Sequence, residues 1–219
     1  MEVRTILLSK SVFEDNDRAA DELRAALRRK GTVLVNVMSS PGAGKTTLLV
    51  ALIRRLAKSR RIGVMEADID SDVDAVTVAK ETGCPCVQLH TGGMCHLDAG
   101  MTGQGLRELG DGFDLIFLEN VGNLVCPAEY DTGATFSMVI LSVPEGTDKP
   151  LKYPLVFQKC DLVVISKTDA LPYFDFDLEE CRRNVGERNG GACVIPVSAK
   201  TGENMDALEN WFIKKLTEV

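Results

Sequence analysis

The segment at residues 39–47, Ser-Ser-Pro-Gly-Ala-Gly-Lys-Thr-Thr, constrains the fold of this chain more than any other. It follows a β-branched, apolar stretch at 32–38 and precedes a helical pattern at 44–59. Small residues between a strand and a helix allow backbone N–H groups to wrap phosphates, while the lysine reaches the β and γ oxygens and the hydroxyl ligates magnesium. Ser39 replaces the usual first glycine of this G-x-x-x-x-G-K-[ST] pattern. The expected phosphate contacts come from Gly42, Ala43, Gly44, Lys45, Thr46 and Thr47.

The alternation of short apolar strands and helices continues along the chain, after an amphipathic helix expected at 11–30. Strands are expected at 62–67, 86–90, 113–118, 137–143, 162–166 and 192–197, and helices at 73–82, 97–109, 178–188 and 205–216. This order predicts an α/β fold with a mainly parallel sheet and helices on both faces. A chain of 219 residues suits a single domain, with 1–30 as a helical segment and 31–219 as a P-loop core. Three prolines at 144–154 predict a long loop.

Charge and cysteine content exclude several classes of protein. The net charge of −7 argues against nucleic acid held through its phosphates and against an anionic membrane surface. No apolar run has the length of a membrane span and the N-terminus lacks an apolar signal core, which predicts a cytoplasmic protein. The seven cysteines, an odd number in such a chain, favour reduced thiols or metal ligands over a disulfide framework.

Two short segments at predicted strand ends favour guanine as the base. The segment 166–169, Ser-Lys-Thr-Asp, resembles the Asn-Lys-x-Asp element of GTP-binding proteins, whose carboxylate accepts from the guanine N1–H and 2-amino groups. A Ser-Ala-Lys triplet follows the next strand, where a backbone N–H meets guanine O6 in such proteins. The alternative is a pair of surface turns with ATP as the ligand. The expected guanine contacts are Lys167, Asp169, Ser198, Ala199 and Lys200.

Acidic residues at two further strand ends predict a magnesium and catalytic centre. Asp68 and Glu119 each follow an apolar strand, and Gly122 stands where a glycine amide senses the γ-phosphate in many GTPases. Asp74 is a candidate for orienting water, although the aspartates at 70, 72 and 74 also suit a solvated helix start. We expect catalytic roles for Lys45, Asp68, Asp74 and Glu119, and magnesium ligation by Thr46, Asp68 and Glu119.

Cys95, His96 and Cys126 form a second candidate metal centre. Both segments that carry them follow motifs expected near the γ-phosphate. Thiolate and imidazole donors suit zinc or nickel rather than magnesium. Three ligands do not close a tetrahedral site, so a second subunit across a two-fold axis is expected to complete it. The alternative is a pair of inert small cysteines and a surface histidine.

Several of these segments resemble the HypB family, the GTPases that help insert nickel into [NiFe]-hydrogenases. The resemblance covers the P-loop at 38–49, Cys-His-Leu-Asp-Ala at 95–99, Glu-Asn-Val-Gly-Asn-Leu-Val-Cys-Pro-Ala at 119–128, and the run from Ser142 to Pro154. It extends from about residue 30 to the end of the chain. The segment 119–128 is far more specific than the P-loop.

The resemblance implies a P-loop GTPase of the SIMIBI branch that slowly hydrolyses GTP to GDP and forms a homodimer promoted by GTP. Cys95, His96 and Cys126 would bind nickel or zinc at or near the dimer interface. Lys152 matches a family lysine that reaches nucleotide in the other subunit. Nickel would pass to the hydrogenase large-subunit precursor, with a HypA-type chaperone as partner.

Three features depart from the family pattern. The chain has neither the N-terminal Cys-x-x-Cys-Gly-Cys motif nor a histidine-rich tract of many members, so a tight N-terminal nickel store is not expected. Gly100 stands where some relatives have a histidine, and Ser166 replaces the asparagine of the guanine element. Two alternatives stay open: a metal carrier whose nucleotide pocket controls dimerisation with negligible turnover, and a urease-type accessory GTPase. The 119–128 segment argues against a cobalamin-type GTPase.

Overall fold

The computed structural model describes residues 8–69 and 71–218, so Met1–Thr5 and Asp70 lie outside the described residues. Within them, seven parallel strands form one sheet in the order β3-β2-β4-β1-β5-β6-β7. The strands are β1 (Val33–Ser39), β2 (Ile62–Asp68), β3 (Cys86–His90), β4 (Leu115–Glu119), β5 (Phe136–Ser142), β6 (Leu162–Ser166) and β7 (Cys193–Pro196). This confirms the predicted α/β class, and the sheet is entirely parallel.

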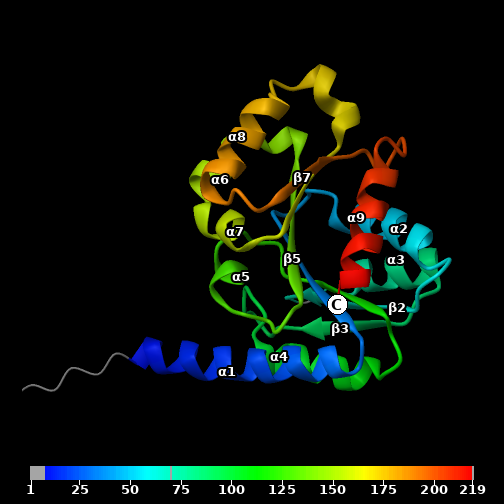
Figure 1. The fold of residues 1–219 in the computed structure, drawn as a ribbon, viewed down its shortest axis with the longest axis vertical. Helices are drawn as coiled ribbons and strands as arrows, with labels where there is room; N and C mark the ends of the chain where they lie inside the picture. The colour runs from blue at the N-terminus through cyan, green and yellow to red at the C-terminus, as the bar shows by residue number, and fades with distance from the viewer. Residues whose placement is uncertain (1–7, 70, 219) are drawn as a thin grey trace, which may run out of the picture.

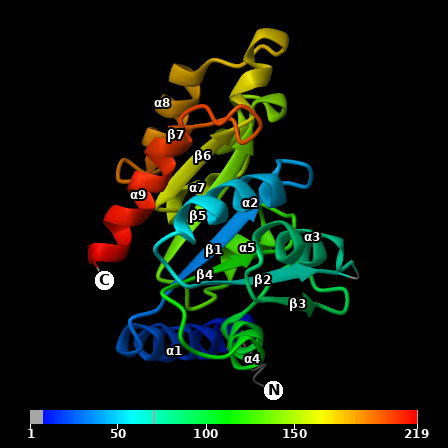
Figure 2. The same ribbon diagram turned by 90° about the vertical axis from the view of Figure 1, so that its right-hand side faces the viewer.

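Helices cover both faces of the sheet (Figures 1 and 2). They are α1 (Leu8–Arg29), α2 (Lys45–Leu56), α3 (Val73–Thr82), α4 (Ala99–Leu109), α5 (Cys126–Glu129), α6 (Lys149–Lys152), α7 (Pro154–Lys159), α8 (Leu178–Arg188) and α9 (Met205–Glu218), with 3-10 turns η1 (Val143–Glu145) and η2 (Thr168–Tyr173). On one face α2 and α9 pack against the sheet, and on the other α1 lies along α4.

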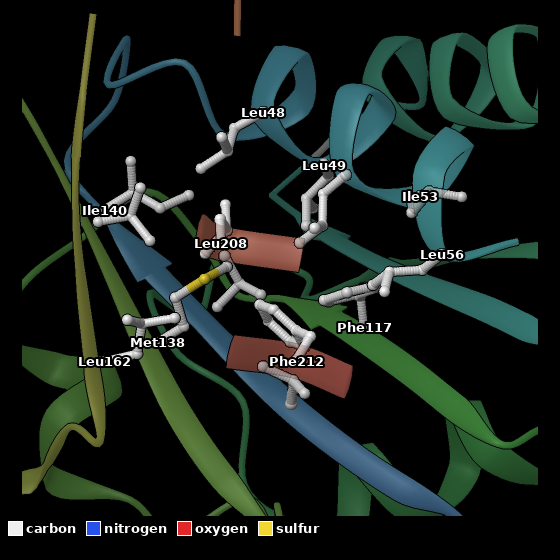
Figure 3. Packing of buried hydrophobic residues seen from close by; sticks show 14 of the residues in the cluster. Leu48, Leu49, Ile53, Leu56, Phe117, Met138, Ile140, Leu162, Leu208 and Phe212 are labelled. Atoms are coloured by element: carbon white, nitrogen blue, oxygen red, sulfur yellow. The ribbon is translucent and has the colours of Figure 1, made fainter. Parts of the chain in front are cut away.

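Alternation along the central strand explains why the hydrophobic clusters on the two faces of the sheet are separate. Val33, Val35 and Val37 of β1 face α2 and α9, whereas Leu34 packs on the opposite side with the core beneath α1 and α4. Figure 3 shows the first core, where leucines of α2 and α9 meet Phe117 and other side chains of the strands. Because both faces are covered, the β1 strand is buried at every position.

One prediction about the chain path is wrong. The segment 144–154 is not a long loop but contains η1, α6 and the start of α7. Each of its three prolines lies in the first turn of a helical element, where the missing N–H costs no hydrogen bond. Glu145 also accepts from the N–H and hydroxyl of Ser142, each at 2.8 Å, and so caps η1.

Candidate functional site

The loop between β1 and α2 has the backbone geometry of a phosphate cradle. Gly42 and Gly44 have φ angles of 75° and 90°, a region that glycine adopts without steric strain. Lys45 begins α2, so the free N–H groups of the first helical turn and the positive end of the helix dipole face the loop. The loop can therefore hold the phosphates of a nucleotide.

The serine that replaces the first glycine fits the strand geometry. Ser39 is the last residue of β1, is fully buried, and is not among the described residues with positive φ. Its hydroxyl donates to the carbonyl of Ser40 at 2.7 Å. A glycine is therefore not required at this position by the backbone.

The two predicted guanine segments lie together beside the P-loop. Ser198 donates its hydroxyl to Asp169 at 2.7 Å, while the Lys200 ammonium lies 3.8 Å from the same carboxylate. Lys167 has a φ of 60° and donates to the Gly42 carbonyl at 2.7 Å, so its side chain reaches the phosphate loop. These contacts join the segments at the ends of β6 and β7 to the nucleotide loop.

Ser166, the departure from the asparagine of the guanine element, also contacts the P-loop. Its buried hydroxyl donates to the carbonyl of Ala43 at 2.7 Å. A serine therefore connects β6 to the loop with a single hydrogen bond. Asp169 is the second residue of η2, and its carboxylate lies at the same edge of the sheet as the Ser-Ala-Lys segment.

Acidic side chains line the other end of the P-loop, around a cavity of about 320 Å³. The Lys45 ammonium lies 3.6 Å from Glu119, and Thr46 donates its hydroxyl to Asp74 at 2.9 Å. Asp68 lines the same cavity and accepts from the N–H of Ser71 at 2.8 Å. Carboxylate and hydroxyl oxygens are the ligands that Mg²⁺ prefers, and a second carboxylate oxygen of Glu119 has no hydrogen-bond partner among the described residues. The residues present thus fit a magnesium ion.

A glutamate that sequence reasoning did not single out lies inside this cavity. Glu66 of β2 is the register partner of Glu119 on β4, and both residues are buried, each 2% exposed overall. Burial, and then the charge of Glu119, raise the pKa of Glu66, while burial also raises the pKa of Glu119 against the opposing charge of Lys45. Two adjacent buried carboxyl groups do not both ionise readily, and the Lys45 ammonium, 3.6 Å from Glu119, favours the charge on Glu119 and the proton on Glu66. An acidic residue interrupting an otherwise apolar strand was the sequence feature that could have revealed it.

Replacing Glu66 with glutamine should stabilise the nucleotide-free protein at neutral pH. The folded state keeps Glu66 protonated, whereas the unfolded chain releases the proton above its ordinary pKa of 4.5. The wild type therefore loses stability as the pH rises above this value, and Glu66→Gln does not. We expect the variant to gain about 1 to 3 kcal/mol in free energy of unfolding at pH 8 and little at pH 4.

Urea denaturation across this pH range measures the gain, with Glu187→Gln as the control because that carboxylate is exposed on α8. A glutamine variant that is less stable than wild type at pH 8 would contradict the assignment of the proton to Glu66.

The segment after β4 is tied to the P-loop and to the sheet. A side chain added at Gly122 would approach Pro41 to 3.2 Å, which is tight for a Cβ. Asn120, fully buried, donates to Asn36 of β1 at 3.0 Å and accepts from the N–H of Val121 at 2.9 Å. Changes at the P-loop can therefore be transmitted to the residues that lead to Cys126.

Cys95 contacts both of the other predicted soft-metal ligands. Its sulfur lies 3.9 Å from Nδ1 of His96, and a hydrogen bond with Cys126, followed by burial, raises the pKa of its thiol. Within residues 8–69 and 71–218, however, no three Cys, His, Asp or Glu side chains are arranged to hold a metal ion. A single subunit thus brings the three side chains into contact but does not arrange them around a shared metal position.

The remaining cysteines lie apart from this pair. Cys160 and Cys181 are buried, and burial raises the pKa of each thiol to about 12. Burial likewise raises the pKa of Cys86 to about 12, while Cys84 and Cys193 are half-buried. These thiols are suited to packing rather than to metal binding.

Lys152 and Gly100 lie on the surface. The Lys152 ammonium pairs with Asp148 one helical turn earlier at 2.5 Å, is 62% exposed, and does not line the cavity beside the P-loop. Gly100 is exposed on the first turn of α4. In the part of the chain that the structure describes, no helix combines the length and hydropathy needed to cross a bilayer.

The fold and this site define a P-loop nucleotide-binding protein. Residues 33–196 match the CobW/HypB/UreG nucleotide-binding domain. The hydrogenase maturation factor HypB of Azotobacter chroococcum mcd 1 is 45% identical over 95% of this chain and 68% of its own length. The hydrogenase/urease maturation factor HypB of Helicobacter hepaticus is 38% identical, covering 97% of this chain and 88% of its own. The chain belongs to the HypB family.

Solved structures agree with this assignment. HypB from Helicobacter pylori in complex with nickel superposes with a TM-score of 0.88 at 36% identity, covering 93% of this chain and 96% of that one. HypB from Archaeoglobus fulgidus gives a TM-score of 0.85 at 36% identity, with 93% and 99% coverage. The signal recognition particle receptor FtsY from Elizabethkingia anophelis, bound to GDP, shares the fold at a TM-score of 0.57 and 13% identity. The architecture is thus that of the SIMIBI branch of P-loop GTPases.

Proposed function

We propose that this protein hydrolyses GTP slowly and uses the nucleotide state to control nickel binding during maturation of the [NiFe]-hydrogenase large subunit. One observation carries the proposal: residues 119–126 lie against the P-loop at one end, through Glu119 and Gly122, and bear Cys126 at the other. The Helicobacter pylori HypB whose structure this chain resembles is described as a complex with nickel. Nickel is here the cargo of the protein.

The nucleotide chemistry follows from the residues around the P-loop. Lys45, released from Glu119, would contact the β and γ oxygens of GTP, while Asp169 and the Ser-Ala-Lys loop hold guanine. Thr46, Asp68 and Glu119 would hold magnesium, which neutralises charge that develops on the phosphates. Asp74 would orient the attacking water once Thr46 leaves its hydroxyl contact.

A homodimer would complete the soft-metal site. Cys95 and Cys126 offer two thiols in contact and His96 a third donor, which is fewer than a closed tetrahedral site needs. Two copies related by a two-fold axis would present twice this set. The exposed apolar side chains Met94 and Val125 flank the cysteines and suit such an interface. Nickel would then pass to the large-subunit precursor, with a HypA-type chaperone as partner.

The carrier alternative differs from the proposed enzyme in whether GTP is hydrolysed. A protein that only uses GTP to control dimerisation would bind the nucleotide and leave it intact. The urease-type alternative concerns the recipient of the metal, and the Helicobacter hepaticus relative is described as a hydrogenase/urease maturation factor. Both alternatives keep the same two sites.

Single-turnover GTP hydrolysis separates the enzyme from the carrier. We expect phosphate release above background that increases with protein concentration, because a second subunit contributes Lys152. Lys152→Ala should remove this concentration dependence. Lys149→Ala is the control. Lys149 lies on the same short helix as Lys152, and its ammonium lies 5.3 Å from the ring centre of Tyr153. Hydrolysis indistinguishable from background in the wild type would favour the carrier.

A further inference from the structure

The leading helix α1 contacts both loops that carry the candidate metal ligands. The side-chain amide of Asn16 accepts from the N–H of Ala99 at 2.9 Å and donates to the carbonyl of Asp131 at 2.9 Å. Ala99 begins α4 four residues after Cys95, and Asp131 lies five residues after Cys126. One half-buried amide thus fixes the backbone of the two loops relative to each other.

An aromatic stack forms a second connection between the same elements. Tyr130 lies face to face with His96, with ring centroids 3.8 Å apart and planes inclined by 12°. Tyr130 also contacts Phe13 of α1, with ring centroids 5.0 Å apart and planes inclined by 40°. The imidazole is therefore held between its own loop and a ring from the Cys126 loop, which α1 supports.

The attachment of α1 to the second loop continues beyond Asn16. Arg24 donates to both carboxylate oxygens of Asp131 at 2.7 and 2.6 Å and to the carbonyl of Ala134 at 2.9 Å. Gly133 has a φ of 77°, and a Cβ there would approach the Leu23 side chain to 2.8 Å. The helix lies against this loop closely enough that movement of one requires movement of the other. Figures 1 and 2 show α1 running alongside α4, whose first residue is Ala99.

We infer that Asn16 and Tyr130 are positioning residues for the soft-metal site, through which the leading helix sets the distance and orientation between the Cys95–His96 pair and Cys126. The inference rests on the proposed function of these three residues as metal ligands. It adds residues outside every motif that identifies the family site. Metal affinity therefore depends on the position of α1 against the two loops. A partner that displaces α1 lowers the metal affinity of the site without contacting a metal ligand.

Loss of the contacts made by Asn16 or Tyr130 should lower metal affinity rather than abolish binding. The three ligands remain in Asn16→Ala, but the two loops must be ordered when the metal binds. Residues that orient metal ligands typically contribute about 10- to 100-fold in affinity. We expect Asn16→Ala and Tyr130→Leu each to weaken Ni²⁺ and Co²⁺ binding about tenfold, and Tyr130→Phe to retain wild-type affinity because it keeps the stacked ring.

The experiment is titration of the protein, residues 1–219, with Ni²⁺ and Co²⁺, followed by the thiolate-to-cobalt absorption band. Arg18→Ala is the matched control, because this arginine is exposed on α1 and bonds only Asp15 on the same helix among the contacts of the described residues. GTP affinity and the thermal midpoint of each metal-free variant verify that the fold is intact. The absorption band reports thiolate ligation directly. If Asn16 only stabilised the fold, the titration followed by this band would be the same in Asn16→Ala and in the wild type.

The outcomes separate this inference from the proposed site. Wild-type affinity in Asn16→Ala and Tyr130→Leu, together with loss of binding in Cys126→Ala, overturns the inference and leaves the metal site standing. Equal binding by wild type and Cys126→Ala overturns the site itself. Equal weakening in Arg18→Ala assigns the effect to the stability of α1 and also overturns the inference. Equal weakening in Tyr130→Phe and Tyr130→Leu shows that the stacked ring does not set the affinity, which likewise overturns it.

Discussion

Replacing Lys45 with alanine should reduce GTP affinity about 30- to 1,000-fold, corresponding to the loss of about 2 to 4 kcal/mol of charge-assisted hydrogen bonding to the phosphates. The lysine begins α2 directly after a glycine loop, so its ammonium is fixed at the phosphates rather than free in solvent. Its side chain is 12% exposed, and its neutralising partner Glu119 is 3% exposed. Removing it also leaves a buried carboxylate whose pKa then rises further.

Titration with a fluorescent GTP analogue measures this effect. Lys30→Ala provides the control, because Lys30 pairs with Asp111 at the surface, where an ion pair contributes little. A Lys45→Ala protein that binds GTP within threefold of wild type would show that the nucleotide does not occupy the P-loop.

Replacing Cys126 with alanine should weaken nickel binding about 100-fold or more and leave GTP affinity unchanged. The thiol is in contact with Cys95, so its removal eliminates one donor and frees the other sulfur from its hydrogen bond. The raised pKa of Cys95 means that metal must displace a proton. Nickel affinity should therefore fall as the pH decreases.

The control for this variant is Cys84→Ala, which removes a half-buried thiol two residues before β3, outside the contact between Cys95 and Cys126. Spectroscopic titration at two pH values gives both affinities. An unchanged nickel isotherm in Cys126→Ala would remove this residue from the site.

The strands and the nucleotide loop could be predicted from sequence because local pattern and tertiary structure agree there. The strand after Gly31 is mostly apolar and is buried throughout because the sheet is covered on both faces, and the loop after it needs glycine at two positive-φ positions. The helices at 73–82 and 178–188 were predicted at their observed bounds. Their ends are marked locally, by Gly83 with a φ of 72° and by the capping carboxylate of Asp177.

Features that depend on contacts distant in sequence could not be predicted. The pairing of Glu66 with Glu119 requires the order of β2 and β4 in the sheet, which the sequence does not state. The contacts of Asn16 join residues 83 and 115 positions apart along the chain. The prolines of 144–154 were read as loop residues, although their fixed φ also suits the first turn of a helix.

Nickel titration of the wild type with GDP or with a non-hydrolysable GTP analogue tests whether the nucleotide state controls metal binding. We predict tighter binding with the analogue, by about 5- to 150-fold, because the proposed GTP-promoted dimer would complete the ligand set. Cys95→Ala should remove the difference. Identical isotherms in the two nucleotide states, with the GTP analogue fully bound, would show that the nucleotide does not control metal binding.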